Sequence, residues 1–340
     1  MKIAIHKSGG FSERWVAYCE KNNIDYKIVN AYDSGIVEQV KDCDAFMWHH
    51  SHINYKDALF AKQLLFSLEM AGKKVFPDWR TCWHFDDKVG QKYLLEAIGA
   101  PLVPSYVFYT KKEALDWINK TSFPKVFKLR GGAGAANVKL AHTATEARKL
   151  VRKAFGKGFT QYNSLVNLKD RWRLYRIGKT DFKDVLKGVI RLGYKPDFAK
   201  MHAPEKGYIY FQEFIPNNST DFRVKVVNGN CWAFQRSVRS NDFRASGSGH
   251  LVFDNQQIPQ KMVLSAQETA KKLQLQSVAF DFIHDKVNDT YLIIEMSYGF
   301  GFDENEMCNG YWDCKGQFHN EQFNPFDWMV EEVIKSVQNK

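Results

Sequence analysis

The chain has 340 residues, of which 44% are hydrophobic and 15% aromatic, so it can bury a large core and is not a disordered protein. It contains no run of about 18 uncharged apolar residues and no apolar signal region at its start, so we expect neither a spanning helix nor export, and we place it in the cytoplasm. The net charge of +10 is concentrated in residues 152–206, which hold fourteen Lys or Arg against five Asp or Glu, and this excludes a generally basic binding protein.

The six cysteines show no paired C-x-x-C spacing. Neither a disulfide framework nor a zinc site is therefore indicated, and a reducing compartment fits best.

Short apolar runs alternate with helical patterns in the first eighty residues. The runs lie at residues 2–5, 25–29, 45–50 and 73–76, and the helical patterns at 11–21, 34–41 and 56–70. This alternation predicts a parallel βαβ domain. Small ligands bind at the carboxyl ends of such strands, which here carry residues 7–10, residues 48–52 and Asp78.

The remaining chain has a mixed pattern and is expected to form an α+β region. A helix is expected at residues 86–98, with Gly99 as its stop, and the proline pair Pro101 and Pro104 marks a linker. Two apolar strands around residues 227–230 (VNGN) predict a hairpin, since Asn and Gly accept the positive φ that its turn requires. We expect three domains: residues 1–80, residues 81–208 with a basic insertion at about 157–206, and residues 209–340.

A strand ending in Lys128 precedes a loop rich in glycine, with Gly131, Gly132 and Gly134. Backbone N–H groups of such a loop can approach phosphate oxygens, and a strand-borne lysine adds a fixed positive charge. A structural hairpin is the alternative, because the pattern matches neither a P-loop nor a dinucleotide fingerprint.

Two carboxylates, Asp281 and Glu295, lie on two strands that we expect to be neighbours. Carboxylates in such strands are costly unless a cation meets them, and Mg²⁺ takes one or two carboxylates together with nucleotide phosphates. The alternative is a carboxylate satisfied by a neighbouring arginine.

Basic side chains cluster between these two motifs, and Arg223 and Lys225 share one side of a strand by its two-residue period. With Arg236 and Arg244 they are candidates to clamp a transferring phosphoryl group and the acyl phosphate that it forms. On an exposed strand the same residues would be a solvated face.

Taken in order, these motifs resemble the ATP-grasp superfamily over roughly residues 82–300, most closely its ribosomal-protein glutamate ligases and peptide ligases. The resemblance implies that Lys88 and Lys128 contact ATP phosphates and that Gly131, Gly132 and Gly134 form a lid. It implies an adenine-binding hinge at Gln212, Glu213, Phe214 and Ile215. Asp221 and Arg223 match the family's D-x-R, Arg236 matches a basic residue on the returning strand, and Arg244 lies in a segment (NDFRASGSG) that resembles the family's DFR and Gly-rich turn. Asp281 and Glu295 match the metal carboxylates, whereas Ser297 stands where the family usually has asparagine.

The resemblance implies a ligase with ATP and Mg²⁺, or Mn²⁺ as the alternative ion. ATP phosphorylates a carboxylate of a small molecule or glycan, and an amine then attacks the acyl phosphate to form an amide. A sugar acid or an amino acid of cell-surface polysaccharide biosynthesis is the expected substrate by analogy. An ATP-grasp kinase and a non-catalytic nucleotide-binding protein at a membrane surface are the alternatives.

The basic insertion is longer than the family's usual connection, and residues 182–190 repeat apolar side chains at helical spacing among Lys and Arg. Residues 170–195 are therefore expected either to contact an anionic membrane surface or lipid-linked substrate at the inner face of the membrane, or to pack on their own domain. Nucleic acid is the weakest alternative.

Two further segments carry polar side chains that the motifs do not absorb. His49, His50 and His52 follow a strand, where substrate contact or exposure is favoured over a zinc site. In the tail, Asp303, Glu304 and Glu306 are expected either to recognise an amine or to face solvent.

Overall fold

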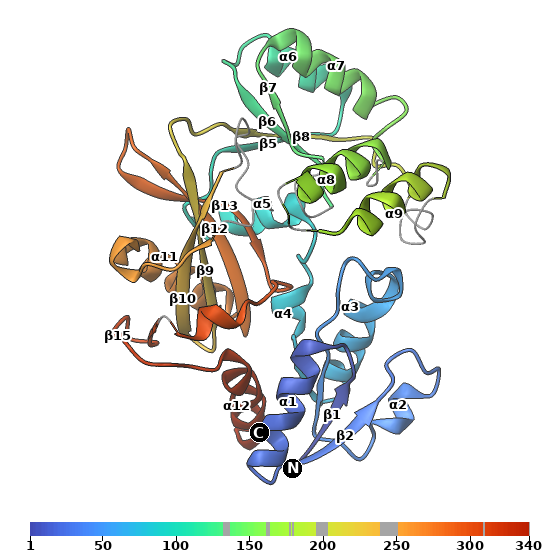
Figure 1. Cartoon of the computed structure of the whole chain (residues 1–340), viewed down its shortest axis with the longest axis vertical. Helices are drawn as coiled ribbons and strands as arrows, with labels where there is room; N and C mark the ends of the chain where they lie inside the picture. The colour runs from blue at the N-terminus through green and yellow to red at the C-terminus, as the bar shows by residue number, and fades with distance from the viewer. Residues whose placement is uncertain are drawn as a thin grey trace. The chain divides into compact units, whose positions relative to one another are not determined.

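The computed structural model describes residues 1–131, 137–160, 164–176, 178, 180–194, 203–238, 251–308 and 310–339 (Figure 1). The chain forms two compact units. The first comprises residues 1–85, 93–102 and 215–340, and the second residues 86–92 and 103–214.

A parallel four-stranded sheet, in the order β2-β1-β3-β4, begins the first unit. Its strands are β1 (Lys2–His6), β2 (Asp25–Val29), β3 (Ala45–Met47) and β4 (Lys74–Phe76), joined by α1 (Gly10–Lys21), α2 (Ile36–Gln39) and α3 (Tyr55–Met70) and followed by α4 (Trp79–Cys82) and α5 (Lys88–Ala97). Parallel neighbours require crossover connections, which the helices supply. The predicted parallel βαβ arrangement is confirmed.

An antiparallel sheet forms the rest of the first unit, in the order β13-β12-β9-β10-β14-β15 with β11 paired to β10. Its strands are β9 (Thr220–Val227), β10 (Asn230–Ser237), β11 (Leu251–Val252), β12 (Ser277–Asp285), β13 (Thr290–Ser297), β14 (Tyr311–Trp312) and β15 (Phe318–His319). The short helices η1 (Asn255–Gln257) and η2 (Glu304–Cys308) and the helix α11 (Gln260–Leu273) accompany it. Asn228 and Gly229 turn the β9–β10 hairpin with φ of 48° and 80°, as the sequence predicted.

The C-terminal helix α12 (Pro325–Gln338) packs against α1 and β4, which are distant from it in sequence (Figure 1). It shares a core with the N-terminal sheet, to which Ile5, Trp15, Phe326 and Val330 contribute. Residues 1–80 and 215–340 lie in this first unit, whereas residues 209–214, which the sequence analysis placed in the last domain, lie in the second unit.

The second unit is built on an antiparallel sheet in the order β5-β8-β6-β7. Its elements are β5 (Ser105–Phe108), α6 (Lys111–Ile118), β6 (Lys125–Lys128), β7 (Lys139–Ala141), α7 (Ala144–Ala154), α8 (Ser164–Arg176), α9 (Phe182–Gly193) and β8 (Ile209–Glu213). Residues of α6 and α7 share a core with Phe127 and Phe211 of the sheet. Among the described helices of both units, none has the length and apolar character needed to cross a membrane.

Gly299, two residues beyond β13, is closely packed, because an added Cβ would lie 2.4 Å and 2.6 Å from ring atoms of Phe85. The ring is 5% exposed and cannot easily move away. We expect Gly299→Ala to lower the free energy of unfolding by about 1–3 kcal/mol, measured by urea denaturation. Gly301→Ala, whose Cβ would meet nothing within 4 Å, is the matched control. An equally stable Gly299→Ala protein would contradict this packing.

Candidate active site

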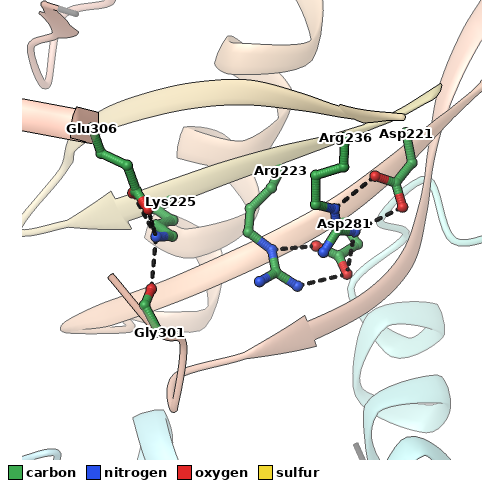
Figure 2. A network of polar contacts seen from close by, with 7 residues as sticks. All are labelled: Asp221, Arg223, Lys225, Arg236, Asp281, Gly301 and Glu306. Carbon is green, nitrogen blue, oxygen red and sulfur yellow. Dashed lines mark hydrogen bonds and ion pairs between the residues drawn. The ribbon is translucent and has the colours of Figure 1, made fainter. Parts of the chain in front are cut away.

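One face of the antiparallel sheet carries charged side chains (Figure 2), and apolar side chains of the other face form a core. Along β9, Asp221, Arg223 and Lys225 alternate with Phe222, Val224 and Val226, because side chains of a strand point alternately to its two faces. The three apolar residues pack in a core with α11 residues Met262, Val263 and Ala266. The prediction that Arg223 and Lys225 lie on the same side of a strand is confirmed.

Register brings partners from three strands onto the charged face. Arg236 of β10 lies opposite Asp221, and Asp281 of β12 lies opposite Arg223. Glu295 of β13 lies opposite Asp281, beside a register shift between Asp281 and Phe282. Bulges of this kind re-aim side chains and are frequent next to active sites.

Two arginines and two aspartates form a continuous network on this face (Figure 2). Arg223 donates from Nε and Nη2 to the two oxygens of Asp281, at 2.7 Å and 2.9 Å. Arg236 donates from the same two atoms to the oxygens of Asp221, at 2.7 Å each, and its Nη2 also lies 2.9 Å from Asp281 Oδ2. The alternative considered for Asp281, satisfaction by a neighbouring arginine, is therefore present in the structure.

Burial and charge act in opposite directions on these carboxylates. Burial alone would raise the pKa of Asp281, but the charges of Arg223 and Arg236 outweigh it and hold the pKa well below its usual range. For Asp221, burial is the larger effect and raises the pKa. Asp281 is therefore ionised at neutral pH, and the two arginines supply the compensating charge.

Lys225 lies on the same face, but its ammonium is enclosed and 1% of the side chain is exposed (Figure 2). Its Nζ donates to Glu306 Oε1 at 2.8 Å, to Glu306 Oε2 at 2.5 Å and to the Gly301 carbonyl at 2.8 Å. Burial lowers the pKa of Lys225 to about 8 in spite of Glu306. Contact with a phosphoryl group was expected of Lys225, but three oxygens already hold its three protons, so we now propose a positioning role.

Glu306 was not expected to be buried. It is 3% exposed, it accepts hydrogen bonds from Trp232 Nε1 at 2.7 Å and from the backbone N–H of Asp303 at 3.0 Å, and it holds Lys225. Solvent exposure, one of the two roles considered from the sequence, is therefore wrong for Glu306. In the structure, the ammonium group that Glu306 binds is that of Lys225.

The second unit carries the residues expected to bind nucleotide. Lys128 ends β6 and is 4% exposed, and Lys88 begins α5 at 6% exposed, with its backbone N–H 2.9 Å from the Arg130 carbonyl. Gly131 donates its N–H to Glu205 at 3.3 Å. Gly132 and Gly134 lie outside the described residues, and so does Arg244.

The segment expected as the adenine hinge begins in β8 and crosses the division of the chain into its two units, which falls between Phe214 and Ile215. Gln212 donates to Ser105 Oγ at 3.0 Å. The Glu213 carboxylate accepts from Lys125 at 2.6 Å and 2.7 Å, and Lys125 is only 2% exposed. Lys125 could not be predicted as a partner of Glu213, because no local pattern links it to a residue 88 positions away.

Two neutral histidines, His49 and His50, follow the carboxyl end of β3. Burial lowers the pKa of His49 to about 4 and that of His50 well below its usual range. His49 stacks on Phe11 with ring centroids 3.7 Å apart. No group of three or more His, Cys, Asp or Glu that could hold a metal ion occurs among the described residues.

Comparisons with known proteins reveal the fold. No protein-family model matches the chain, and no curated protein matches it. Solved structures that resemble it include the ATP complex of Bacillus anthracis D-alanine–D-alanine ligase, which is 11% identical with a TM-score of 0.59 and coverage of 100% of this chain and 98% of the ligase.

Two other solved structures give a similar result. N5-carboxyaminoimidazole ribonucleotide synthetase from Thermotoga maritima is 15% identical with a TM-score of 0.59, and the match covers 98% of this chain and 75% of the synthetase. A RimK-domain ATP-grasp protein from Sphaerobacter thermophilus is 12% identical with a TM-score of 0.55, and the match covers 98% of this chain and 100% of that protein. These likenesses show that the chain has the ATP-grasp fold, as the order of its motifs predicted.

Proposed function

We propose that the protein is an ATP-dependent carboxylate–amine ligase, which activates a carboxylate as an acyl phosphate and joins it to an amine. The ATP-grasp fold supports this proposal, and the charged sheet face with Arg223, Arg236, Asp281 and Glu295 is the observation that carries it. The Bacillus anthracis ligase that shares the fold was solved with ATP.

The nucleotide is proposed to meet the second unit. Lys88 and Lys128 would contact its phosphates, with Gly131, Gly132 and Gly134 as the covering loop, and backbone groups of residues 212–215 would hold adenine. Burial of both lysines supports this assignment, because a nearly buried ammonium gains most from an anionic partner.

The donor set at the edge of the charged face suits Mg²⁺ or Mn²⁺. Asp281 and Glu295 face each other across two strands, and Ser297 lies on the same face of β13, opposite Ala279. Hard cations of this kind take carboxylate oxygens together with phosphate oxygens. When bound, such an ion would neutralise phosphate charge. The described donors are two carboxylates and a hydroxyl. Asp281 would exchange part of its hydrogen bonding with Arg223 and Arg236 for the ion, because both of its oxygens accept from these arginines in the structure.

The chain's own residues would act by position and charge. Attack of the substrate carboxylate on the γ-phosphorus forms a new P–O bond and releases ADP. The amine nitrogen then attacks the acyl carbon, the C–O bond to phosphate breaks, and the nitrogen loses a proton. Arg223 and Arg236, fixed by Asp281 and Asp221, would stabilise the negative charge that develops in both steps.

The carboxyl ends of β1 and β3 are proposed to approach the acceptor substrate. There the strand order of the parallel sheet reverses, and Ser8 and His49 each keep a buried polar atom without a hydrogen-bond partner among the described residues. Neutral donors of this kind suit hydroxyl groups, which supports a sugar acid or another glycan carboxylate over a highly charged substrate.

The test measures Mg²⁺-dependent release of ADP from ATP in the presence of each member of a panel of uronic acids, nucleotide sugars and amino acids. Hydroxylamine is added to trap acyl phosphate as hydroxamate. We expect hydroxamate with one carboxylate, and a fall to background in Glu295→Gln, because this change removes a proposed metal carboxylate. Glu268→Gln, an exposed carboxylate on α11, should leave activity unchanged. ADP release without hydroxamate, with a product stable to hydroxylamine, would instead identify a kinase.

A non-catalytic role predicts a different result. Tight ATP binding without turnover of any carboxylate would favour a nucleotide-binding protein or a lipid-linked substrate outside the panel. Modification of a polysaccharide is the biological role that we propose for this ligase activity.

A further inference from the structure

The helices α8 and α9 lie side by side and form a hairpin (Figure 1). Val185 and Gly188 of α9 are buried against α8. A Cβ on Gly188 would lie 3.0 Å from Leu168 Cδ1 and 2.9 Å from Arg171 Cδ, so the helices approach closely where glycine leaves room. The packing face of α9 is therefore occupied, and its other faces are available to a partner.

An exposed apolar stripe runs along α9. Phe182, Leu186, Val189 and Ile190 follow helical spacing and are between 48% and 62% exposed. An apolar stripe of this width normally packs on a core. A contiguous exposed patch usually marks an interaction site.

Aromatic residues extend the stripe onto α8. Trp172 lies 5.8 Å from Tyr175 and Tyr175 lies 5.6 Å from Phe182, measured between ring centroids. Trp172 and Tyr175 are 49% and 38% exposed. Rings with an apolar body and a polar edge are enriched at the boundary between lipid and water.

Basic side chains border the apolar stripe. Lys183, Lys187 and Arg191 lie along the adjacent side of α9, and Lys169 and Arg176 are exposed on α8.

The acidic residues of the hairpin offset little of this charge. Asp184 pairs with Arg171, and Asp170 lies 3.9 Å from Arg173, so both are engaged within the hairpin. Asp181 is exposed at the start of α9. The charge presented beside the apolar stripe is therefore positive.

We propose that the α8–α9 hairpin lies on the surface of an anionic lipid bilayer. The apolar stripe and aromatic rings would enter the boundary between headgroups and acyl chains, and the lysines and arginines would contact lipid phosphates. Charge complementarity favours an anionic bilayer over another protein as the partner of the hairpin. Nucleic acid is disfavoured, because four adjacent aliphatic and aromatic side chains would find no apolar surface on a phosphate backbone. The surface does not depend on the ligase reaction proposed above.

The test is co-sedimentation of the full chain with vesicles of phosphatidylcholine alone or mixed with phosphatidylglycerol. We expect binding to the mixed vesicles only, weakened by high salt. Lys183→Glu/Lys187→Glu should raise the Kd on the order of 25-fold or more, since each basic residue near the surface contributes about fivefold. Leu186→Ser/Ile190→Ser should raise it about tenfold or more, because both side chains would leave the apolar layer.

Two matched variants serve as controls. Leu59→Ser removes a 72% exposed apolar side chain from α3, and Lys149→Glu/Arg152→Glu reverses two exposed charges on α7 of the same unit. Both should bind vesicles as the unchanged protein does, within about twofold.

Several results would overturn the proposal. These are absent vesicle binding, equal binding by hairpin and control variants, or a dimer or an RNA complex that the hairpin variants abolish. A lower Tm of Leu186→Ser/Ile190→Ser without vesicles would show that the stripe packs within the protein. None of these measurements involves ATP turnover, so failure here is distinct from failure of the proposed ligase activity.

Discussion

Replacing Lys225 by methionine is expected to lower the free energy of unfolding by about 3–5 kcal/mol. The change leaves Glu306 as a buried charge that keeps, among the described residues, two neutral hydrogen bonds, from Trp232 and from the Asp303 backbone. Urea denaturation at pH 7 measures the effect. The large loss is expected because removing one partner of a buried pair costs more than removing the whole pair.

A double variant and an exposed pair provide the controls. Adding Glu306→Gln to Lys225→Met should recover part of the loss, because it removes the uncompensated charge. Lys261→Met breaks the pair with Asp289, whose side chains are 52% and 74% exposed, and should cost less than about 1 kcal/mol. A Lys225→Met protein as stable as Lys261→Met would contradict the buried pair.

The double variant also separates two roles of Lys225. If Lys225 positions the segment around Gly301 and Glu306, the folded double variant should retain hydroxamate formation with mainly a higher KM. If its ammonium contacts a phosphoryl group, kcat should fall steeply even though the protein is folded. The enclosed Nζ favours the first result.

Local patterns predicted most of the strands and helices, because their signals lie within a few residues. The parallel βαβ series and the turn at Asn228 and Gly229 need only hydrophobic alternation and turn chemistry. The helix α8 was missed, because its apolar residues are distributed around it among Lys and Arg. The helix α12 was not predicted either, although Asn324 at its N-cap and Pro325 at its first position are recognisable signals.

The candidate site was predictable along single strands and between strands close in sequence. The two-residue period placed Arg223 and Lys225 on one face, and Asp281 and Glu295 were expected on neighbouring strands. The register between β9 and β12, which brings these two pairs together, carries no local signal. Lys225 and Glu306 are 81 residues apart, so no local pattern predicts that they pair. From the sequence alone, a phosphate-binding lysine therefore cannot be distinguished from a buried structural lysine. Burial and the identity of the partner, which only the tertiary structure provides, separate these roles.

Acidification from pH 7 to pH 5 is expected to lower the free energy of unfolding by roughly several kcal/mol, because His49, His50 and His84 of the first unit resist protonation in the folded chain. Burial, aided by the nearby ammonium of Lys62, lowers the pKa of His84 to about 3, and burial together with neighbouring charges lowers that of His50 well below 6.5. His50 is 2% exposed and His84 fully buried. Below about pH 6.5, the pKa of histidine in the unfolded chain, the unfolded chain binds protons that the folded chain does not bind. The free energy of unfolding therefore decreases as the pH is lowered, by about 2 kcal/mol per histidine at pH 5.

Urea denaturation at several pH values between about 7.5 and 4.5 gives the slope of the free energy of unfolding against pH. This range brackets the titration of histidine in unfolded chains. A His50→Gln/His84→Gln variant should show a flatter dependence, whatever its stability at pH 7, because neither side chain then titrates in the unfolded state. His142→Gln, at an exposed position, should keep the slope of the unchanged protein. An unchanged slope in the double variant would mean that other groups control acid unfolding. A flatter slope would identify the buried imidazoles of His50 and His84 as the sensitive groups, which limits assays of the proposed acceptor site to pH values above about 6.5.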